Sequence, residues 1–503
     1  MKNVILTLLL IVVIFFSAFS QNQPTERQLI EKTIELYFDG WATGDSTKLG
    51  QAMHSSCHLK NYNNGKFVEF TRDQYLRLFK PHERNKNLKT RIVAMDITNN
   101  MGSAKVEIST ERDLYIDYFN LMKTNEGWFI ADKVSTRTTH KIVDVNAILP
   151  KKETIIEGLK RPWSIAFMSE NEVLISEKEG HLVKTNLLTK EKTRIQGYPT
   201  DLEDSIAGFG DNTGKFEILL DPDFNTNKYV YLSYVAKKSA SRTTKIIRAV
   251  LKDDSLQQIK VLFVAAPYTK ERYHYGGGMV FGNDGKLYFT IGERLFSEQD
   301  EPIVPIAQNI EDKRGKIYRI NSDGTIPKDN PDFGSKATPG LYAIGIRAAQ
   351  GITLDRTHNK IWFTEHGTHQ GDEINVLHAK ANYGWPMKTT GKYRFAEFAP
   401  KAIPNNVYTD PIWYWLHTVA PTGLHFYSGI EFAAWTGNLL VGGLSKGSLW
   451  RMVIEGEHVQ RVEELFTDDR VRIRKVTQSP MGKLYILTDE IDGKLIRVRN
   501  AAF

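Results

Sequence analysis

One pattern recurs from residue 156 to the end of the chain, and it constrains the fold more than any other feature. An apolar strand is followed by a polar turn, a second apolar strand that ends in an acidic or polar residue, and a third strand. Examples are RPWSIAFMSENEVLISEKEGHLVKTNL, GGMVFGNDGKLYFTIGER and VTQSPMGKLYILTDEIDGKLIRVRN. Six units of roughly 40 to 60 residues, with about four strands each, are typical of a β-propeller and exceed one β-sandwich. We therefore predict a mainly β protein with a six-bladed propeller.

A segment of different character precedes these units. TERQLIEKTIELYFDGWATGD places apolar residues at helical spacing, and Thr25 with Gln28 resembles a capping box at its start. Alternating segments then run to GWFIADKVST with NEG as a hairpin turn, which indicates antiparallel strands. Helices followed by a curled sheet predict a small α+β domain over 21–142, a linker over 143–155 and the propeller over 156–503.

Two phrases of this α+β domain, YFDGWATGD and GWFIADKV, resemble the nuclear transport factor 2-like cone in its SnoaL-like or lumazine-binding variety. Such cones can host an enzyme, or they only bind and dimerise, so a homodimer is one implied partner. No paired aspartate and histidine stand here in a clear catalytic spacing. We therefore expect a binding or packing role for the cone.

The start of the chain predicts export. Residues 1–20, MKNVILTLLLIVVIFFSAFS, combine one lysine, an apolar core and small residues before a cut after Ser20, which is the pattern of a signal peptide. A membrane anchor is the alternative, but the apolar run is short for a span of about 20 residues. We expect a periplasmic or secreted protein whose one cysteine, Cys57, forms no internal disulfide. The net charge of +7 comes without a basic stripe among aromatic residues, which argues against a nucleic-acid partner.

The stretch YHYGGG sets His274 between two tyrosines and places three glycines after it, where a strand begins. Glycine weakens a strand unless something comes close to the backbone. Either another segment of the protein packs there, or a flat ligand lies there with the histidine at its edge. A lone histidine is more often a buried structural residue, but an imidazole with a pKa of about 6.5 also suits proton transfer at neutral pH.

Phrases spread over the propeller resemble one enzyme family. They are RPWSIAF, DPDFNTNKYVYLSY, GKIYRINSDGTIPKDNP, TEHGTHQGDEIN, ANYGWP, VAPTGLHFYSG and GNLLVGGL. Their order is similar to that in the soluble pyrroloquinoline quinone (PQQ) dependent sugar dehydrogenases, the glucose/sorbosone dehydrogenase family, in its short aldose sugar dehydrogenase branch. The resemblance implies PQQ across the channel mouth, a calcium ion (Ca2+) beside it, an aldose oxidised at C1 to a lactone, and a soluble or membrane electron acceptor.

The same resemblance assigns roles to single residues. It implies that His274 is the catalytic base and that Arg347 lies near the quinone, where it serves both catalysis and cofactor binding. Arg472 and Arg474 alternate along VRIRKV, match the family's arginine pair, and suit the three carboxylates of PQQ. An exposed strand face is the alternative explanation for that alternation. Further residues implied for the cofactor are Gln350, Thr418 and Lys446, and those implied for the substrate are Asn212 and Tyr273.

Calcium is implied by TEHGTHQGDE, where the backbone carbonyls of Gly367 and Thr368 match the family's ion ligands. Calcium accepts carbonyl oxygens, so a changed side chain does not remove such a site. An alternative interpretation takes the acidic and imidazole side chains of this loop as a transition-metal cluster. That cluster would consist of His366, His369, Asp372 and Glu373. We favour calcium, because an Asp-Glu pair before an apolar strand more often ties a loop down.

Several positions depart from the family pattern. Ala348 and Ala349 replace an asparagine and a proline, Ser445 replaces a cofactor-binding lysine, and Tyr273 replaces an aspartate. Loss of one charge-assisted contact costs about 1.5–3 kcal/mol, so the substrate and the PQQ affinity are open. The competing hypotheses are a propeller that binds carbohydrate or a protein partner without turnover, and a metal-dependent lactone hydrolase. The hydrolase would need side-chain calcium ligands in the central channel, and the sequence shows no obvious set.

Overall fold

The structure is a computed structural model that describes residues 24–63, 66–110, 113–139, 148–208, 210–294, 304–393, 407–445 and 447–501. The predicted leader, residues 1–20, therefore lies outside the described residues. The chain divides into two compact units between Ala147 and Ile148. In the described ranges no helix is long and apolar enough to cross a membrane.

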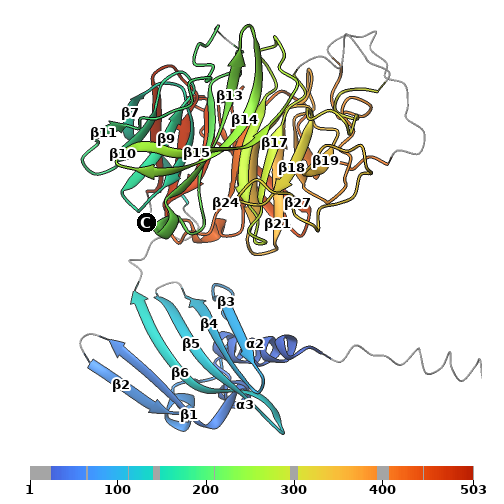
Figure 1. Cartoon of the computed structure of the whole chain (residues 1–503). Coiled ribbons are helices and arrows are strands. Elements are labelled where there is room, and N and C mark those ends of the chain that lie inside the picture. The colour runs from blue at the N-terminus through green and yellow to red at the C-terminus, as the bar shows by residue number, and fades with distance from the viewer. Residues whose placement is uncertain are drawn as a thin grey trace, which may run out of the picture. The chain divides into compact units, whose positions relative to one another are not determined.

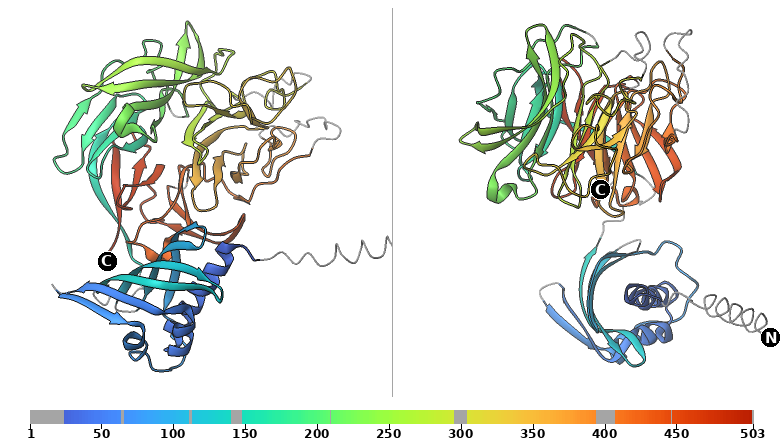
Figure 2. Two further views of the ribbon diagram at one scale, coloured as in Figure 1. Left: turned by 60° about the horizontal axis from the view of Figure 1, so that its bottom comes forward. Right: turned by 45° about the vertical axis from the view of Figure 1, so that its right-hand side comes forward.

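The first unit is a curled, mostly antiparallel sheet with helices on its concave face (Figure 1; Figure 2, right). Its strand order is β2-β1-β6-β5-β4-β3, and β1 runs parallel to β6. The helices are α2 (Glu26–Thr43), α3 (Ser46–Ala52) and α4 (Arg72–Leu76). The strands are β1 (Met53–Asn63), β2 (Lys66–Thr71), β3 (Lys89–Thr98), β4 (Met101–Ser109), β5 (Asp113–Thr124) and β6 (Gly127–Thr139).

Local sequence sets the length of α2. Thr25 and Gln28 form the predicted capping box at its start, and Gly44 ends it in the left-handed region with φ 64°. The buried stripe of the helix, which includes Ile30, Ile34 and Tyr37, packs with the inward side chains of the sheet into one core. Cys57 is a buried free thiol of this core, as expected for a chain with one cysteine.

The second unit is the predicted six-bladed propeller, built from six four-stranded antiparallel sheets (Figure 2, left). Blade one comprises β8 (Pro162–Phe167), β9 (Glu172–Glu177), β10 (Leu182–Asn186) and β11 (Lys192–Arg194). Blade two comprises β12 (Lys215–Leu220), β13 (Tyr229–Lys238), β14 (Ser241–Lys252) and β15 (Ser255–Val264), with the short helix α5 (Phe224–Asn227) in its first turn. Blade three comprises β16 (Gly276–Phe281), β17 (Leu287–Ile291), β18 (Lys316–Ile320) and β19 (Leu341–Ile344).

The remaining blades close the ring. Blade four comprises β20 (Ala349–Asp355), β21 (Lys360–Glu365), β22 (Glu373–Val376) and β23 (Trp413–Tyr414). Blade five comprises β24 (Pro421–Phe426), β25 (Leu439–Gly443), β26 (Leu449–Glu455) and β27 (His458–Leu465), with the 3-10 turn η1 (Ala433–Trp435). Blade six comprises β28 (Ile473–Gln478), β29 (Leu484–Thr488) and β30 (Gly493–Asn500), and its outer strand is β7 (Pro150–Leu159) from the start of the unit.

The pairing of β7 with β30 joins the two ends of the propeller and removes a free sheet edge. This strand begins at Pro150, inside the range 143–155 that is predicted to be a linker. Residues 143–147 of that range lie outside the described residues. The predicted linker therefore contributes its last part to the propeller.

The innermost strands β8, β12, β16, β20, β24 and β28 contact one another in succession around the ring. In each blade the innermost strand pairs antiparallel with the second strand, as β16 does with β17 and β28 with β29. The segment before each innermost strand therefore lies at the same end of the ring as the segment after each second strand. Side chains from these two kinds of loop can converge on one mouth of the channel.

Candidate functional site

His274 lies at this mouth, in the loop before β16, and its imidazole is paired with an acidic residue. Its Nδ1 atom is 2.8 Å from Oε1 of Glu293, which stands two positions after the end of β17. A carboxylate accepts, so the Nδ1–H donates and the lone pair remains on Nε2. Burial and the positive charge of Arg347 lower the pKa of His274 to about 4, against the opposing effect of Glu293. The imidazole is therefore neutral at pH 7 and can accept a proton at Nε2.

Arg347, the residue predicted to lie near a quinone, is buried in the loop before β20. Its Nη1 donates to the His366 carbonyl over 3.2 Å, and its guanidinium lies 5.0 Å from the centroid of the Trp385 ring. Its backbone N–H donates to the carboxyl group of Glu365, which ends β21. Burial and the facing carboxyl of Glu373 raise the pKa of Glu365. Blade three also holds Arg347, because its backbone carbonyl accepts the Glu293 N–H over 2.9 Å, and its charge acts on His274.

Arg472 and Arg474 share one carboxylate, that of Asp489 just after β29. Arg472 Nη2 is 2.7 Å from Asp489 Oδ2, and Arg474 Nη2 is 3.0 Å from Asp489 Oδ1. Arg474 Nη1 also donates to Oε1 of Gln350 in β20 over 2.7 Å, which links blade six to blade four. Burial alone would raise the pKa of Asp489, but Arg474, Lys178 and Arg472 outweigh burial and lower that pKa. The alternating arginines are therefore not a solvated strand face.

A third cation, Lys178, faces the same carboxylate. Lys178 follows β9 and is 4% exposed, and its Nζ donates to the Asp211 carbonyl over 2.8 Å. Burial lowers its pKa to about 8, and Arg474 adds to the decrease while Asp489 opposes it. Three cationic side chains therefore surround one carboxylate, so this corner has a deficit of negative charge.

Electrostatic interactions connect this arginine corner, which consists of Arg472, Arg474, Lys178 and Asp489, with His274. The charges of Arg474 and Arg347 both lower the pKa of His366, which burial lowers most. His366 in turn acts on His274, as Arg347 does. Hydrogen bonds link the same residues, since Glu293, the partner of His274, donates its backbone N–H to the Arg347 carbonyl over 2.9 Å, and Gln350 accepts from Arg474. His274, Arg347, Gln350 and Arg474 thus form one linked group from blades three, four and six.

The loop 366–372 is folded by its own polar groups. Both carboxylate oxygens of Asp372 accept backbone N–H groups, from Gly367 over 2.9 Å and from Val419 and Ala420 over 2.7 Å. His366 Nε2 lies 2.9 Å from the Pro421 carbonyl. These contacts explain the Asp-Glu pair as a loop anchor.

Other side chains of this loop are also committed to protein partners. Glu373 accepts the Thr390 hydroxyl over 2.6 Å. Within the described ranges no three His, Cys, Asp or Glu side chains are placed to hold a metal ion. Thr418, predicted to contact the cofactor, is exposed and donates its hydroxyl to the His369 carbonyl over 2.9 Å, next to Thr368. Lys446, the remaining residue predicted for the cofactor, lies outside the described residues.

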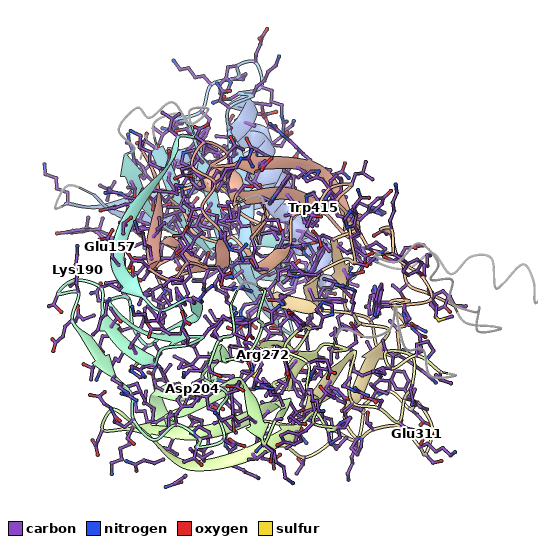
Figure 3. The ribbon with its side chains drawn as sticks, turned by 90° about the horizontal axis from the view of Figure 1, so that it is seen from above. Glu157, Lys190, Asp204, Arg272, Glu311 and Trp415 are labelled. Carbon is purple, nitrogen blue, oxygen red and sulfur yellow. The ribbon has the colours of Figure 1, made fainter. Side chains whose placement is uncertain are left out.

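The two residues predicted for the substrate, Asn212 and Tyr273, lie next to Arg272, the first through a hydrogen bond and the second in sequence. Asn212 donates its backbone N–H to the Arg272 carbonyl over 2.8 Å. The Arg272 guanidinium binds Asp211 over 2.6 Å and reaches Glu203 at 3.5 Å, so it ties the loop before β12 to the loop before β16. Figure 3 shows Arg272 near the centre of the ring. Tyr273, next in sequence, is 40% exposed and stands beside His274.

The three glycines after His274 serve protein packing. A Cβ at Gly276 would lie 2.7 Å from the Thr290 carbonyl oxygen, one at Gly277 2.5 Å from Phe216 Cδ2, and one at Gly278 2.8 Å from the Gln350 carbonyl oxygen. Gly276 and Gly277 also have positive φ, 73° and 100°. Of the two explanations that the sequence left open, close approach of other protein segments is the one that the structure supports.

Sequence reasoning did not single out Glu293, Asp489 and Lys178. A signal was present, because each follows or ends the second strand of its blade, where the repeating unit places an acidic or polar residue. A similar spacing of 17 to 19 positions recurs: Glu293 stands 19 positions after His274, Glu365 18 after Arg347, and Asp489 17 after Arg472. An acidic residue one hairpin after a candidate site residue therefore predicts its partner.

A six-bladed propeller with an imidazole and several guanidinium groups at its mouth defines a class of ring-shaped enzymes with a site built from loops. The family model described as "Glucose / Sorbosone dehydrogenase" matches residues 159–497, and "Putative lumazine-binding" matches residues 25–135. The chain therefore belongs to the glucose/sorbosone dehydrogenase family and is an oxidoreductase.

Relatives support this membership. Aldose sugar dehydrogenase YliI of Escherichia coli is 31% identical over 357 residues, which cover 69% of this chain and 92% of the relative. Quinoprotein glucose dehydrogenase B of Acinetobacter calcoaceticus is 26% identical and covers 67% of this chain and 85% of its own length. A crystal structure of glucose dehydrogenase superposes with a TM-score of 0.63 at 33% identity, over 69% of this chain and 99% of that chain.

Proposed function

We propose that this protein is an exported quinoprotein that oxidises the C1 hydroxyl of aldose sugars to lactones, with PQQ as the hydride acceptor. The observation that carries the proposal is the cluster in which His274, Arg347, Gln350 and Arg474 meet at one mouth of the propeller. The relatives named aldose sugar dehydrogenase and quinoprotein glucose dehydrogenase support the same chemistry.

The residues present fit PQQ, which is a flat trianion. Arg472, Arg474 and Lys178 supply three cations against the single carboxylate of Asp489, so the corner can accept further negative charge. Arg472 is 36% exposed in its side chain and can reach an entering carboxylate, while Arg474 is buried and fixed by Gln350. Lys178 would gain from an added anion, because its pKa is lowered mainly by burial.

When bound, PQQ supplies an ortho-quinone that accepts the hydride from the sugar. The chain itself handles the proton. His274 takes the C1 hydroxyl proton at Nε2, since its Nδ1–H is committed to Glu293. The Glu293 carboxylate then stabilises the imidazolium that forms, because it is 1% exposed in its side chain and lies in direct contact. The buried charge of Arg347 stabilises negative charge that develops beside it.

Calcium is the second proposed cofactor. The carbonyl oxygens of Gly367 and Thr368 are of the donor type that calcium prefers. Asp372 holds the backbone of this loop through Gly367 and uses both carboxylate oxygens for backbone N–H groups. The calcium would polarise a carbonyl of the cofactor as a Lewis acid.

Titration with PQQ and calcium, followed by absorbance, tests the proposal. We expect saturable binding and dye reduction with at least one member of an aldose panel. His274→Ala should abolish turnover and keep PQQ binding. Binding of a sugar or a protein without PQQ binding would favour the alternative, a propeller without redox turnover. The buried, apolar Ala348 and Ala349 favour that alternative, since neither can replace a polar contact to the cofactor.

A further inference from the structure

The first unit contains a cavity of about 360 Å³ on the concave side of its sheet. It lies between the C-terminal part of α2, the segment around α4, and strands β1, β2, β5 and β6. The lining residues on which the argument depends are Trp41, Tyr75, Phe79, Tyr115, Lys133 and Arg137. The proposed sugar oxidation uses none of them.

The floor of the cavity is a buried hydrogen-bond network. The hydroxyl oxygens of Tyr37 and Tyr75 are 2.8 Å apart. Lys133 Nζ donates to Tyr37 over 2.7 Å and to Tyr75 over 3.3 Å, and Trp41 Nε1 donates to them over 3.1 and 2.9 Å. Lys133 is also paired with Asp117 at 2.8 Å, so its ammonium is charged and can only donate. Both tyrosine oxygens are therefore surrounded by donors.

Counting hydrogens in this network shows which donor faces the cavity. The two hydroxyls carry two hydrogens, and the contact between them uses one. Tyr37 is fully buried and does not line the cavity. Among its hydrogen-bond partners in the described ranges, Trp41 and Lys133 are donors, and Tyr75 is the one that can accept. The Tyr37 hydroxyl therefore donates its hydrogen to Tyr75. The Tyr75 hydrogen then has no acceptor among the described residues, although Tyr75 is only 7% exposed. That hydrogen is therefore available to an acceptor inside the cavity, which Tyr75 lines.

The walls of the cavity are aromatic. The Trp41 ring lies 5.4 Å from that of Phe79 and 5.1 Å from that of Tyr115, and the Tyr75 ring lies 5.1 Å from that of Phe79. Such a set of rings favours a flat guest that makes edge and face contacts.

The charged residues around the cavity are balanced. Lys133 is paired with Asp117, Lys60 with Asp132 at 3.1 Å, and Arg137 with Asp113 at 2.8 Å. Each cation of the lining therefore has its own carboxylate. A ligand with a net charge would find no excess of opposite charge here, so the site favours a neutral molecule.

We propose that this cavity binds a neutral, planar, largely apolar small molecule through one carbonyl oxygen, which accepts a hydrogen bond from Tyr75. The carbonyl supplies the missing acceptor, and the aromatic walls hold the rest of the molecule. The proposal is independent of the sugar-oxidising site, and its test uses no turnover.

A fluorescent aryl ketone, 6-propionyl-2-(dimethylamino)naphthalene, tests the proposal in the full chain. Its emission moves to longer wavelength when its carbonyl accepts a hydrogen bond. We expect saturable binding, and the bound probe should emit at longer wavelength in the wild type than in Tyr75→Phe. Tyr75→Phe keeps the ring but removes the donor, so it should weaken binding about three- to tenfold and move the emission back to shorter wavelength. The carbonyl-free analogue, 2-(dimethylamino)naphthalene, should bind the wild type and Tyr75→Phe equally.

Two further variants keep the test decisive. Tyr118→Phe removes a hydroxyl from a side chain that is 55% exposed and does not line the cavity, and it should change nothing. Thr136→Trp places an indole at an exposed lining position and should block binding without altering the buried network. No binding by the wild type, or equal affinity and emission in the wild type, Tyr75→Phe and Thr136→Trp, would overturn the proposal. Thermal melting and near-ultraviolet circular dichroism confirm that each variant is folded.

Discussion

The Nδ1 atom of His274 lies 2.8 Å from Oε1 of Glu293, and this contact fixes the tautomer of the neutral imidazole, with its hydrogen on Nδ1 and its lone pair on Nε2. His274 adopts φ 51°, an unusual conformation for a residue other than glycine. Its carbonyl accepts the Arg294 backbone N–H over 3.3 Å, so backbone and side chain are both anchored to the segment after β17. The histidine is therefore oriented before any substrate enters.

The pH dependence of His274 follows from this contact. Burial and Arg347 hold its pKa at about 4, and Glu293 opposes them by favouring the protonated form. Glu293→Gln removes the opposing charge, so the pKa should fall further and the acid limb of the pH profile should move to lower pH. Carbon-13 NMR of labelled histidine in the protein without PQQ measures the pKa directly.

Activity gives an independent measure of the same contact. Loss of the carboxylate that stabilises the imidazolium should lower kcat of Glu293→Gln by about ten- to a hundredfold. Glu311→Gln is the control, since Glu311 is exposed and its ion pair with Lys336 is long, at 3.7 Å. A Glu293→Gln variant with an unchanged histidine pKa and an unchanged kcat would show that the contact has no role in proton transfer.

Replacement of the base separates chemistry from binding. His274→Asn should lower kcat by about 10²–10⁴-fold, because the proton must then pass to water. PQQ affinity should stay within about twofold, since the guanidinium groups that would hold the cofactor are untouched. Single-turnover dye reduction and a fluorescence titration measure the two quantities. Parallel loss of both would assign His274 to cofactor binding instead.

The arginine corner should determine cofactor affinity. Arg474→Gln removes a buried guanidinium and breaks the 2.7 Å contact with Gln350, so PQQ should bind about ten- to a hundredfold more weakly. The matched control is Arg499→Gln in the last strand, where the side chain is 52% exposed and is paired with Glu153. Isothermal titration with PQQ compares them. Equal affinity in the two variants would contradict the proposed binding corner.

Sequence and structure agree most closely where periodicity governs the fold. The recurring strand units predicted six blades because alternation and turn residues are local properties of each hairpin. Contacts within one hairpin could also have been predicted from the sequence, because they join residues that are close along the chain. Arg472 and Asp489 are 17 positions apart, and His274 and Glu293 are 19 apart.

Contacts between blades could not be predicted in this way. Arg474 and Gln350 are 124 positions apart in the sequence, and Lys475 and Glu217 are 258 apart, yet each pair forms a hydrogen bond of 2.7 Å. Contacts between residues so far apart in sequence depend on how the ring closes and on the tilt of each blade, which no local pattern contains. The hydrogen-bond network of Tyr37, Tyr75 and Lys133 is of the same kind, since it joins a helix end to a strand of the curled sheet.

The glycines after His274 offer a test of the packing explanation through stability. Gly277→Ala places a Cβ 2.5 Å from Phe216 Cδ2 at φ 100°, so it adds both backbone strain and overpacking. We expect a loss of about 2–4 kcal/mol in the free energy of unfolding. Gly285→Ala is the matched control, because Gly285 has φ 69° with nothing within 4 Å of its Cβ position, and it should cost only about 1–2 kcal/mol from strain. Chemical denaturation measures both variants. Equal losses of unfolding free energy in the two variants would mean that the close approach of Phe216 does not account for Gly277. A flat ligand beside the glycines would then be the favoured explanation.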